Sequence, residues 1–298
     1  MFNMKKLIAG AGVVLAAVTM SGCSGEDVGL GGGDSDKEIT FFQVPGFDDT
    51  TSLSALWQIL LEERGITMKV ENMDLGPGFT AMTTGEVDGY IDSWLPATHQ
   101  NYIDPIRDKV KVWDENGPFY ENNELVLAVP SYAPDDTIEA AFANADAYGG
   151  EIIGIEPGAG LMKNLPNVVE TYGATDKITI TPGSTPAMLA SMEGAIKDKK
   201  NVIVALWTPH WAFQKMDIKI LEDTKNGWPE ADGSYIVTSQ KFAEEHAEIG
   251  QWMSNMRLTS DQFADIMLHA SEGNTPREGM QTWLEKPENR QLTDSWFK

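Results

Sequence analysis

Two tryptophans, Trp94 and Trp207, each precede a proline by two residues. Trp207 follows an apolar run typical of a buried strand, and Trp94 follows a strand-like segment. The surrounding sequences are Val87–His99 (VDGYIDSWLPATH) and Val202–Phe213 (VIVALWTPHWAF). Because proline lacks the N–H that a strand ladder needs, each strand is expected to end at its indole. Aromatic faces attract cations, above all quaternary ammonium groups. These residues therefore suggest cation binding, although a tryptophan at a strand end is also common in a protein core.

A glycine-rich turn is a candidate site for the opposite charge. The segment Gly154–Leu161 (GIEPGAGL) follows a predicted strand and precedes a predicted helix. Backbone N–H groups converge at the start of a helix, where unpaired donors and the helix dipole favour an anion. A tight strand-to-helix turn explains the same glycines equally well, so both interpretations are open.

A third aromatic wall has three candidates in the sequence. Phe47 lies in the first predicted strand-to-helix turn and is the preferred one, while Tyr120 and Trp211 are the alternatives. Each cation–aromatic contact contributes about 0.5–2 kcal/mol, so three faces together give useful affinity.

No recognisable apparatus for catalysis or metal binding is present in the sequence. It lacks a GxSxG elbow, a P-loop, an HExxH motif and paired cysteines. The four histidines never occur at metal-ligand spacing; they are His99, His210, His246 and His269. Ser184, in the segment PGST, is expected to cap a helix and not to act as a nucleophile. We therefore expect a binding protein without catalytic residues, metal or cofactor.

Composition predicts a large, acidic, folded body. The 298 residues include 22 Lys and Arg against 45 Asp and Glu, which gives a formal net charge of -23. Such a surface repels phosphate backbones, so nucleic acid is excluded as a partner. The length exceeds that of a typical domain, and we expect two lobes.

The N-terminus carries an export signal. Two lysines precede an apolar run, Leu7–Met20, that is shorter than the roughly 20 residues of a membrane-spanning helix. Cys23 is the only cysteine, and the small residues before it are similar to a lipobox, in which the cysteine is lipidated. We expect residues 1–23 to be a lipoprotein signal peptide; an ordinary secretory signal is the alternative. Residues 24–37 are expected to form a flexible tether, and the body to lie in the periplasm or on the outer face of the cell membrane.

The rest of the chain alternates strands and helices, which predicts an α/β fold with mostly parallel sheets flanked by helices. Lobe I is expected to comprise residues 38–128 and 225–298, and lobe II residues 129–224. Two chain crossings, near Pro130 and within Leu221–Tyr235, would form a hinge. Ligands of open α/β sheets lie beyond the carboxyl ends of the strands. The two indoles are therefore expected to face each other across a cleft.

Individual elements are expected as follows. The strands are Glu38–Val44, Ile66–Glu71, Glu124–Val129, Glu151–Ile155 and Lys177–Thr181. The helices are Ser52–Arg64, Thr80–Glu86, Ile138–Asn144, Met188–Lys200, Lys241–Met256, Ser260–Ser271 and Pro276–Lys286, with a further helix from Gly160. Thr50 or Thr51 is expected to cap the first helix, Leu75–Phe79 to form a turn, and the chain after Ser239 to be mostly helical.

Three segments together resemble the substrate-binding proteins of glycine betaine/proline betaine ABC transporters. They are VDGYIDSWLPATHQNY, IIGIEPGAGLM and STPAMLASMEGAIKDKKNVIVALWTPHWAF, and the likeness extends from Glu38 to about Trp283. The resemblance implies a two-lobed periplasmic-binding-protein fold, similar to type II, that closes over a compatible solute. It also implies a partner, the permease of an ABC importer in the membrane, and we expect the binding protein to be a monomer.

The resemblance further implies the ligand-binding residues. The matching positions are Trp94 and Trp207 in the aromatic cage, and Gly160, Leu161 and His99 at the ligand carboxylate. Many members of the family have tryptophan in the first turn, where this chain has Phe47. A ligand held from both lobes would favour the closed state through its higher affinity for that state.

A choline-binding protein of the same fold is the principal alternative. Choline lacks a carboxylate, so Asp48 or Asp49 would take its hydroxyl group and His99 would be idle. In the preferred interpretation these two aspartates face solvent or cap the helix that begins at Ser52. His210 is expected to be a hydrogen-bonded core histidine. Two further classes stay open, a secreted hydrolase that uses His210 and an aspartate, and a chemoreceptor-coupled sensor.

Overall fold

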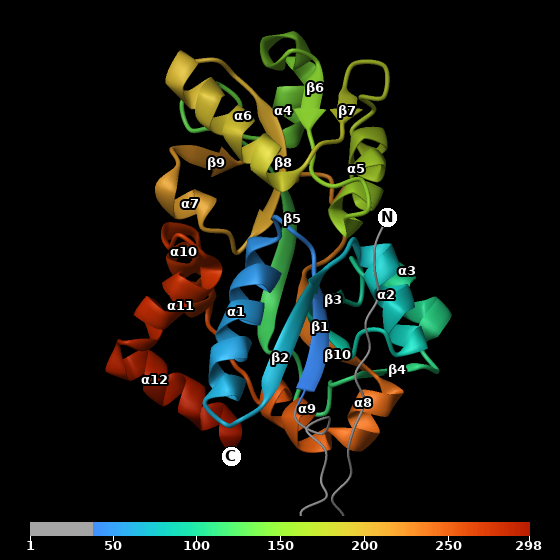
Figure 1. Cartoon of the computed structure of the whole chain (residues 1–298). Coiled ribbons are helices and arrows are strands. Elements are labelled where there is room, and N and C mark those ends of the chain that lie inside the picture. The colour runs from blue at the N-terminus through green and yellow to red at the C-terminus, as the bar shows by residue number, and fades with distance from the viewer. Residues whose placement is uncertain (1–37) are drawn as a thin grey trace, which may run out of the picture. The chain divides into compact units, whose positions relative to one another are not determined.

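The computed structural model describes residues 38–298, and this part of the chain begins with a βαβ unit (Figure 1). Strands β1 (Glu38–Gln43) and β2 (Thr67–Asn72) pair in parallel, and helix α1 (Asp48–Glu62) connects them. Phe41 and Phe42 point to opposite faces of β1 and are both fully buried, because each face has aromatic packing partners. The predicted strand, helix and strand are confirmed.

The chain continues around the same strands with mostly short elements. They are α2 (Leu75–Thr84), β3 (Gly89–Leu95), α3 (Gln100–Ile103), η2 (Asp104–Ile106), β4 (Val110–Val112) and β5 (Tyr120–Pro130). β3 lies parallel to β1, and all 7 of its residues are buried. Such complete burial is typical of a strand whose two faces are both covered.

A second set of parallel strands follows β5. Its elements are α4 (Ile138–Ala143), η3 (Ala145–Tyr148), β6 (Glu151–Ile153), α5 (Gly160–Thr171), β7 (Thr179–Thr181), α6 (Thr185–Asp198), β8 (Ile203–Thr208), α7 (Ala212–Lys215) and β9 (Ile218–Ile220). β6 pairs in parallel with β7 and β8. The hydroxyl group of Ser184 accepts a hydrogen bond from the backbone N–H of Ala187 at the start of α6, which confirms the predicted cap.

Two antiparallel strands join the two parallel sets. The strand order is β2-β1-β3-β10-β5-β8-β6-β7, with β4 on β10 and β9 on β5. β10 (Asp232–Ser239) lies between β3 and β5 and runs antiparallel to both. β5 pairs with β10 near its start and with β8 from Glu124 onward, so it carries the chain from one set to the other (Figure 1).

Helices form the remainder of the chain. They are α8 (Gln240–Glu245), α9 (Ala247–Ser254), α10 (Ser260–Glu272), α11 (Pro276–Leu284), α12 (Pro287–Asp294) and η4 (Ser295–Phe297). Helices α10 and α11 pack against α1 around a core that includes Leu53, Phe263 and Trp283 (Figure 1). Thr275 caps α11 and Pro276 occupies its first turn, as predicted. These helices therefore fix the position of α1, whose first turn borders the site described below.

The start of α1 differs from the prediction. The helix begins at Asp48 instead of Ser52, and its N-cap is Phe47, which makes no side-chain cap. The hydroxyl group of Thr50 donates to the Phe47 carbonyl at 3.2 Å, so the predicted threonine cap is wrong. Two acidic residues in the first turn favour the earlier start, because they complement the positive end of the helix dipole.

The segment Leu75–Phe79 is the beginning of α2 and not the predicted turn. Pro77 is compatible with a helix there because the first-turn N–H groups have no intrahelical acceptor. Gly78 lets the helix approach β1 closely, since a Cβ at this position would lie 2.3 Å from the ring of Phe42.

The last part of the chain contains a strand that the sequence did not predict and a helix that differs from its prediction. The first residues of β10 fall within Leu221–Tyr235, the stretch in which a return crossing is expected. Its strand conformation depends on two neighbours that are distant in the sequence, β3 and β5. The single helix expected over 241–256 is divided into α8 and α9 at His246, whose φ of -128° is not helical.

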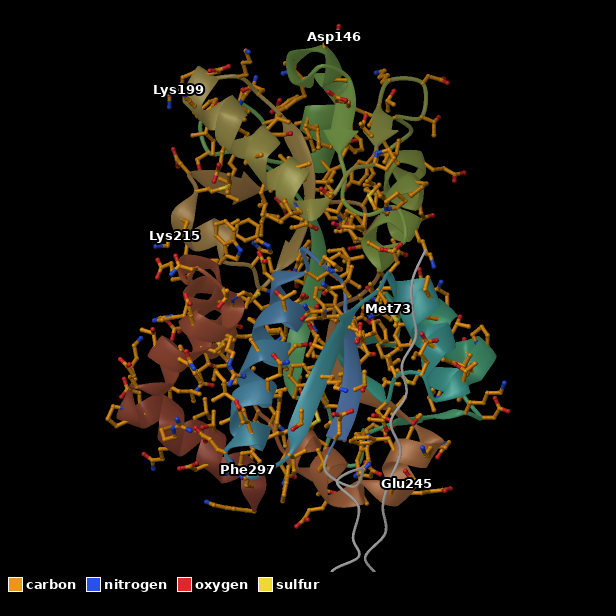
Figure 2. All side chains as sticks on the ribbon, viewed as in Figure 1. Met73, Asp146, Lys199, Lys215, Glu245 and Phe297 are labelled. Carbon is orange, nitrogen blue, oxygen red and sulfur yellow. The ribbon has the colours of Figure 1, made fainter. Side chains whose placement is uncertain are left out.

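Charged side chains such as Asp146, Lys199 and Lys215 project from the surface (Figure 2). No helix within residues 38–298 has the length and apolar character needed to cross a membrane. The predicted signal peptide with Cys23 and the predicted tether, residues 24–37, lie outside the described residues.

Candidate functional site

Both Trp-x-Pro motifs contribute to the lining of one cavity. Trp94 is the last but one residue of β3, and Trp207 is the last but one residue of β8. The peptide bond before the proline is cis in both motifs. The lining consists of Phe47, Asp49, Tyr90, Asp92, Trp94, Thr98, His99, Leu125, Ile155, Ala159, Gly160, Leu161 and Trp207. Every residue that the sequence predicted to bind a ligand belongs to this lining.

Three aromatic side chains form apolar walls of the cavity. Trp94 and Trp207 are each 4% exposed, and Phe47 is 8% exposed. The ring centroids of Phe47 and Trp207 lie 5.9 Å apart. Of the three candidates for the third wall, Phe47 lines the cavity, whereas Tyr120 and Trp211 are absent from its lining. Aromatic faces so far removed from water can attract an onium ion strongly.

His99 offers a hydrogen-bond donor to the cavity. Its Nδ1 accepts a hydrogen bond from the backbone N–H of Trp94 at 3.0 Å, and its backbone N–H donates to the Trp94 carbonyl at 2.9 Å. The ring proton is therefore on Nε2. Burial, together with the nearby positive charge of Lys163, lowers the pKa of His99 to about 3. The imidazole is neutral at pH 7, and Nε2–H is its one available donor.

The first turn of α5 reaches the cavity at Gly160 and Leu161. The first N–H groups of a helix have no intrahelical acceptor, so these amides are available to an anion. Gly160 is required by a close approach, because a Cβ there would lie 2.4 Å from the carbonyl oxygen of Thr98. Thr98 precedes His99, so the imidazole and the α5 amides lie in neighbouring parts of the cavity wall.

Two carboxyl groups also line the cavity. Asp49 is 5% exposed and Asp92 is 1% exposed. Asp49 Oδ1 accepts a hydrogen bond from the backbone N–H of Thr50 at 2.7 Å, whereas the oxygens of Asp92 have no hydrogen-bond partner among the described residues. Burial raises the pKa of both groups, well above the ordinary value for Asp49 and to about 6 for Asp92. The expectation that Asp49 faces solvent or caps a helix from Ser52 is wrong.

The second motif departs from the first after its proline. His210 is buried, as expected for a core histidine, and is not part of the lining. Its Nδ1 accepts a hydrogen bond from the backbone N–H of Ala212 at 3.0 Å, and its Nε2 lies 3.6 Å from Asp48 Oδ2. The indole N–H of Trp211 donates to the same carboxylate oxygen. Burial lowers the pKa of His210 to about 3, so this ring is also neutral. Asp48 therefore joins the second motif to α1 and is neither a cap nor free in solvent.

Several lining residues were not predicted. Tyr90, Leu125, Ile155 and Ala159 are of core types, and nothing in the sequence separates them from other core residues. Asp92 did carry a signal, because it interrupts the apolar strand GYIDSWL with a carboxyl group. Within residues 38–298, no group of three or more His, Cys, Asp and Glu side chains is arranged to hold a metal ion.

Residues 37–286 match the family of substrate-binding domains of ABC-type glycine betaine transport systems. The chain belongs to this family. Its members are transport proteins and not enzymes, and the substrate-binding proteins of ABC importers are extracytoplasmic. The resemblance inferred from the sequence is confirmed.

Two curated relatives agree with this family assignment. The glycine betaine/carnitine transport binding protein GbuC of Listeria monocytogenes is 32% identical over 134 residues, which is 45% of this chain and 45% of the relative. That match therefore spans less than half of the relative's length. The glycine betaine/proline betaine-binding periplasmic protein of Escherichia coli is 22% identical over 279 residues, covering 79% of this chain and 82% of the relative.

Solved structures of the family confirm the periplasmic-binding-protein fold. Lactococcal OpuAC, in its closed-liganded conformation with glycine betaine, matches with a TM-score of 0.79 and 26% identity, over 88% of this chain and 100% of that chain. An ABC-transporter choline-binding protein in complex with choline matches with a TM-score of 0.75 and 20% identity, over 89% and 93% of the two chains. The second likeness concerns the fold alone.

Proposed function

We propose that this protein captures glycine betaine, or a related betaine or onium compatible solute, and delivers it to an ABC importer. One observation carries this proposal: a single cavity combines three aromatic faces with the unpaired donors of His99 and α5. A betaine has a permanently cationic, methylated head and a carboxylate tail. The two kinds of wall match the two ends of such a ligand.

The onium head fits the aromatic walls, because a methylated ammonium group cannot donate hydrogen bonds. The ring faces of Trp94, Trp207 and Phe47 carry negative charge density and would contact the cation in place of its water. Each contact contributes about 0.5–2 kcal/mol, and tryptophan is the strongest partner. Phe47 is therefore the weakest of the three walls for the cation.

The ligand carboxylate, at the end of the betaine opposite its onium head, fits the hydrogen-bond donors of the cavity. His99 Nε2–H and the amides of Gly160 and Leu161 are the groups we assign to it. Hydrogen bonds to a charged group contribute about 1.5–3 kcal/mol each. Because His99 is neutral, it contributes a directed donor, and the dipole of α5 supplies the favourable potential.

We further propose a hinged pair of lobes, with residues 38–128 and 225–298 in lobe I and 129–224 in lobe II. On this division, lobe I contributes Phe47, Trp94 and His99, and lobe II contributes Gly160, Leu161 and Trp207. The hydroxyl group of Tyr102 donates to the Gly158 carbonyl at 2.5 Å across the same division. A ligand that contacts both lobes would stabilise the closed state by its higher affinity for it.

Calorimetric titration of the purified protein tests the proposed ligand. We expect glycine betaine and proline betaine to bind, and unmethylated glycine to bind at least tenfold more weakly, because its ammonium group keeps its water. His99→Ala should weaken betaine binding by about 1.5 kcal/mol, the contribution of a hydrogen bond to a charged group. A protein that binds glycine as tightly as glycine betaine would contradict the proposal.

Choline is the second candidate ligand, and the placement of Asp49 in the cavity wall favours it. The Asp49 carboxyl group could accept the hydroxyl group of choline, in which case His99 has no role. Asp48 is the poorer candidate because it is bonded to Trp211 outside the lining. Unchanged, strong choline affinity in His99→Ala, combined with weak betaine affinity in the wild type, would replace the betaine proposal by this one.

The cellular context is also part of the proposal. We propose that the mature chain is anchored through a lipid on Cys23, that it binds the transporter's permease, and that it is a monomer. Mass spectrometry of the membrane-bound chain should find the lipid mass on Cys23, and light scattering should give the mass of one chain. An unmodified N-terminus would contradict the lipid anchor, and a dimer at working concentration would contradict the monomeric state.

A further inference from the structure

Asp92 lies at a β-bulge next to the cavity. Two residues of β3, Ile91 and Asp92, stand opposite only Ile236 of β10. Asp92 has a φ of 77°, in the left-handed region that residues other than glycine rarely adopt. Bulges redirect side chains, and here the carboxyl group lines the cavity, although its strand is otherwise apolar.

The Asp92 carboxyl group lies close to one other carboxyl group. Neither of its oxygens makes a hydrogen bond of ordinary geometry among the described residues, although the hydroxyl group of Ser234 and the indole of Trp94 lie nearby. The carboxyl group of Asp49, also buried and also in the lining, is the titratable neighbour. Two ionised carboxylates side by side in a buried wall are unfavourable, and a proton held between them removes one charge.

Among the described residues no lysine or arginine lines the cavity beside this pair to replace the proton; Lys163, which acts on His99, lies outside the lining. The titratable groups facing it or its immediate neighbours are Asp48 on α1, Tyr90 on β3, His99 after β3, Glu156 before α5, His210 after β8 and Asp232 on β10. His99 and His210 are neutral above pH 5, because burial lowers the pKa of each to about 3. Asp232 is occupied by two backbone N–H groups, at 2.6 and 2.9 Å. The cavity lining contains no lysine or arginine.

We propose that Asp49 and Asp92 form a proton-sharing pair that selects ligands by their net charge. This inference rests on the proposed function, in which the cavity takes an onium head. A choline-type ligand carries an uncompensated positive charge, which favours loss of a proton from the pair. A betaine carries its own carboxylate, and its net field at the pair is weaker. Capture of choline therefore transfers a proton from the pair to the buffer, whereas capture of glycine betaine transfers less.

Calorimetry with choline chloride and glycine betaine between pH 5 and pH 8 tests the pair. Each titration is made in two buffers of different ionisation enthalpy, so that released protons are counted. We expect the Kd of choline to fall as pH rises, by about tenfold per pH unit at most, which is the limit for one exchanged proton. The Kd of glycine betaine should change less, so the preference for choline over betaine increases with pH.

Asp92→Asn is the informative variant, since asparagine has the same shape and also tolerates the left-handed backbone. It should flatten the choline profile and abolish proton release. Asp146→Asn, at an exposed site (Figure 2), is the matched control and should keep the wild-type profile. A wild-type choline Kd that is independent of pH, or an Asp92→Asn profile parallel to the wild type, overturns the pair and leaves the proposed function intact.

The pH dependence of urea unfolding tests the proton-sharing pair without any ligand. The pair's raised pKa values mean that the folded state prefers the protonated form, so this contribution to stability is lost as pH rises through the folded pKa. The urea midpoint of the wild type should therefore fall relative to that of Asp92→Asn between pH 4 and pH 8. Parallel curves overturn the pair. Absence of binding by both ligands in the titrations refutes the proposed function, and the urea curves then decide the pair by themselves.

Discussion

The two Trp-x-Pro motifs begin alike and end differently. Each places its tryptophan at the end of a strand and in the wall of the same cavity. In the first motif His99, five positions after Trp94, returns to bond the backbone of that tryptophan. In the second motif His210, three positions after Trp207, packs edge-on against its indole with ring centroids 4.8 Å apart.

This difference shows that spacing after the proline decides the role of each histidine. Both rings are buried and neutral, and both use Nδ1 as an acceptor for a backbone N–H. The Nε2 of His99 belongs to a cavity-lining residue, whereas that of His210 lies beside Asp48 on α1. The histidine of the first motif thus lines the cavity, and the histidine of the second motif contacts α1.

The largest expected effect concerns the tryptophan that each motif places in the cavity wall. Trp94→Ala and Trp207→Ala should each weaken glycine betaine binding by about 2 kcal/mol, roughly 30-fold in Kd, because each removes a desolvated cation–aromatic contact. Fluorescence or calorimetric titration measures the loss. Trp228→Ala, at a half-buried tryptophan outside the cavity, is the control and should bind normally. If only one cage variant loses affinity, the two motifs are not equivalent walls.

The second effect separates the histidines. His99→Ala should weaken glycine betaine about tenfold while sparing choline, because only the carboxylate needs the Nε2 donor. His210→Ala should change the affinities of both ligands by the same factor, since its ring lies outside the lining. Parallel titrations of the two variants with the two ligands measure these ratios. A selective loss of betaine affinity in His210→Ala would show that His210, and not only His99, acts on the ligand carboxylate.

A smaller effect is expected at Asp48, which accepts the indole N–H of Trp211. Asp48→Asn should weaken both ligands by about 1 kcal/mol, because a charge-assisted hydrogen bond between α1 and the second motif becomes a neutral one. The rate constant of ligand release, measured by stopped flow, should rise by about the same factor as the Kd. Asp198→Asn, in an exposed pair with Lys200, serves as the matched acidic control. Equal release rates in wild type and Asp48→Asn would exclude Asp48 from closure.

The last effect is a pH dependence of stability, and not of binding, that both motifs share. The pKa of each histidine is about 3 in the folded protein, below its ordinary value, so the unfolded chain binds more protons as pH falls below about 6.5. This contribution to stability is complete above pH 6.5 and is lost on acidification. His210→Gln should therefore lose less stability than the wild type between pH 6.5 and pH 4.5 in urea unfolding. An identical pH slope would mean that His210 is charged or exposed in the folded state.

The local elements were largely predictable. The run EITFFQV, the helix over residues 52–64 and the cap at Ser184 depend on neighbours in the sequence, and all are close to the structure. The errors have a common cause. β10 and the start of α2 depend on distant partners, namely the strands beside β10 and the Phe42 ring beside Gly78. Local pattern carries no information about those partners.

The residues of the candidate site also fall into two groups, those predictable from the local sequence and those placed by distant contacts. Trp94, Trp207 and Gly160 were predictable because strand ends and helix starts gather at one edge of an α/β fold, and aromatic and glycine residues there have a recognisable chemistry. Asp49 was misplaced because the helix begins before it and not after it. Asp92 shares the strand alternation of Tyr90 and Trp94, which also line the cavity, so its carboxyl group within GYIDSWL was a signal that the sequence analysis missed.

By itself, the sequence determined the family, the α/β class and the candidate residues for an onium ion and a carboxylate. These follow from residue type and from spacing along the chain. Only the tertiary structure decided that Asp49 and Asp92 share the wall of the cavity. Their relation depends on the register between β3 and β10 and on the docking of α1, and contacts between such distant segments are set by packing of the whole fold.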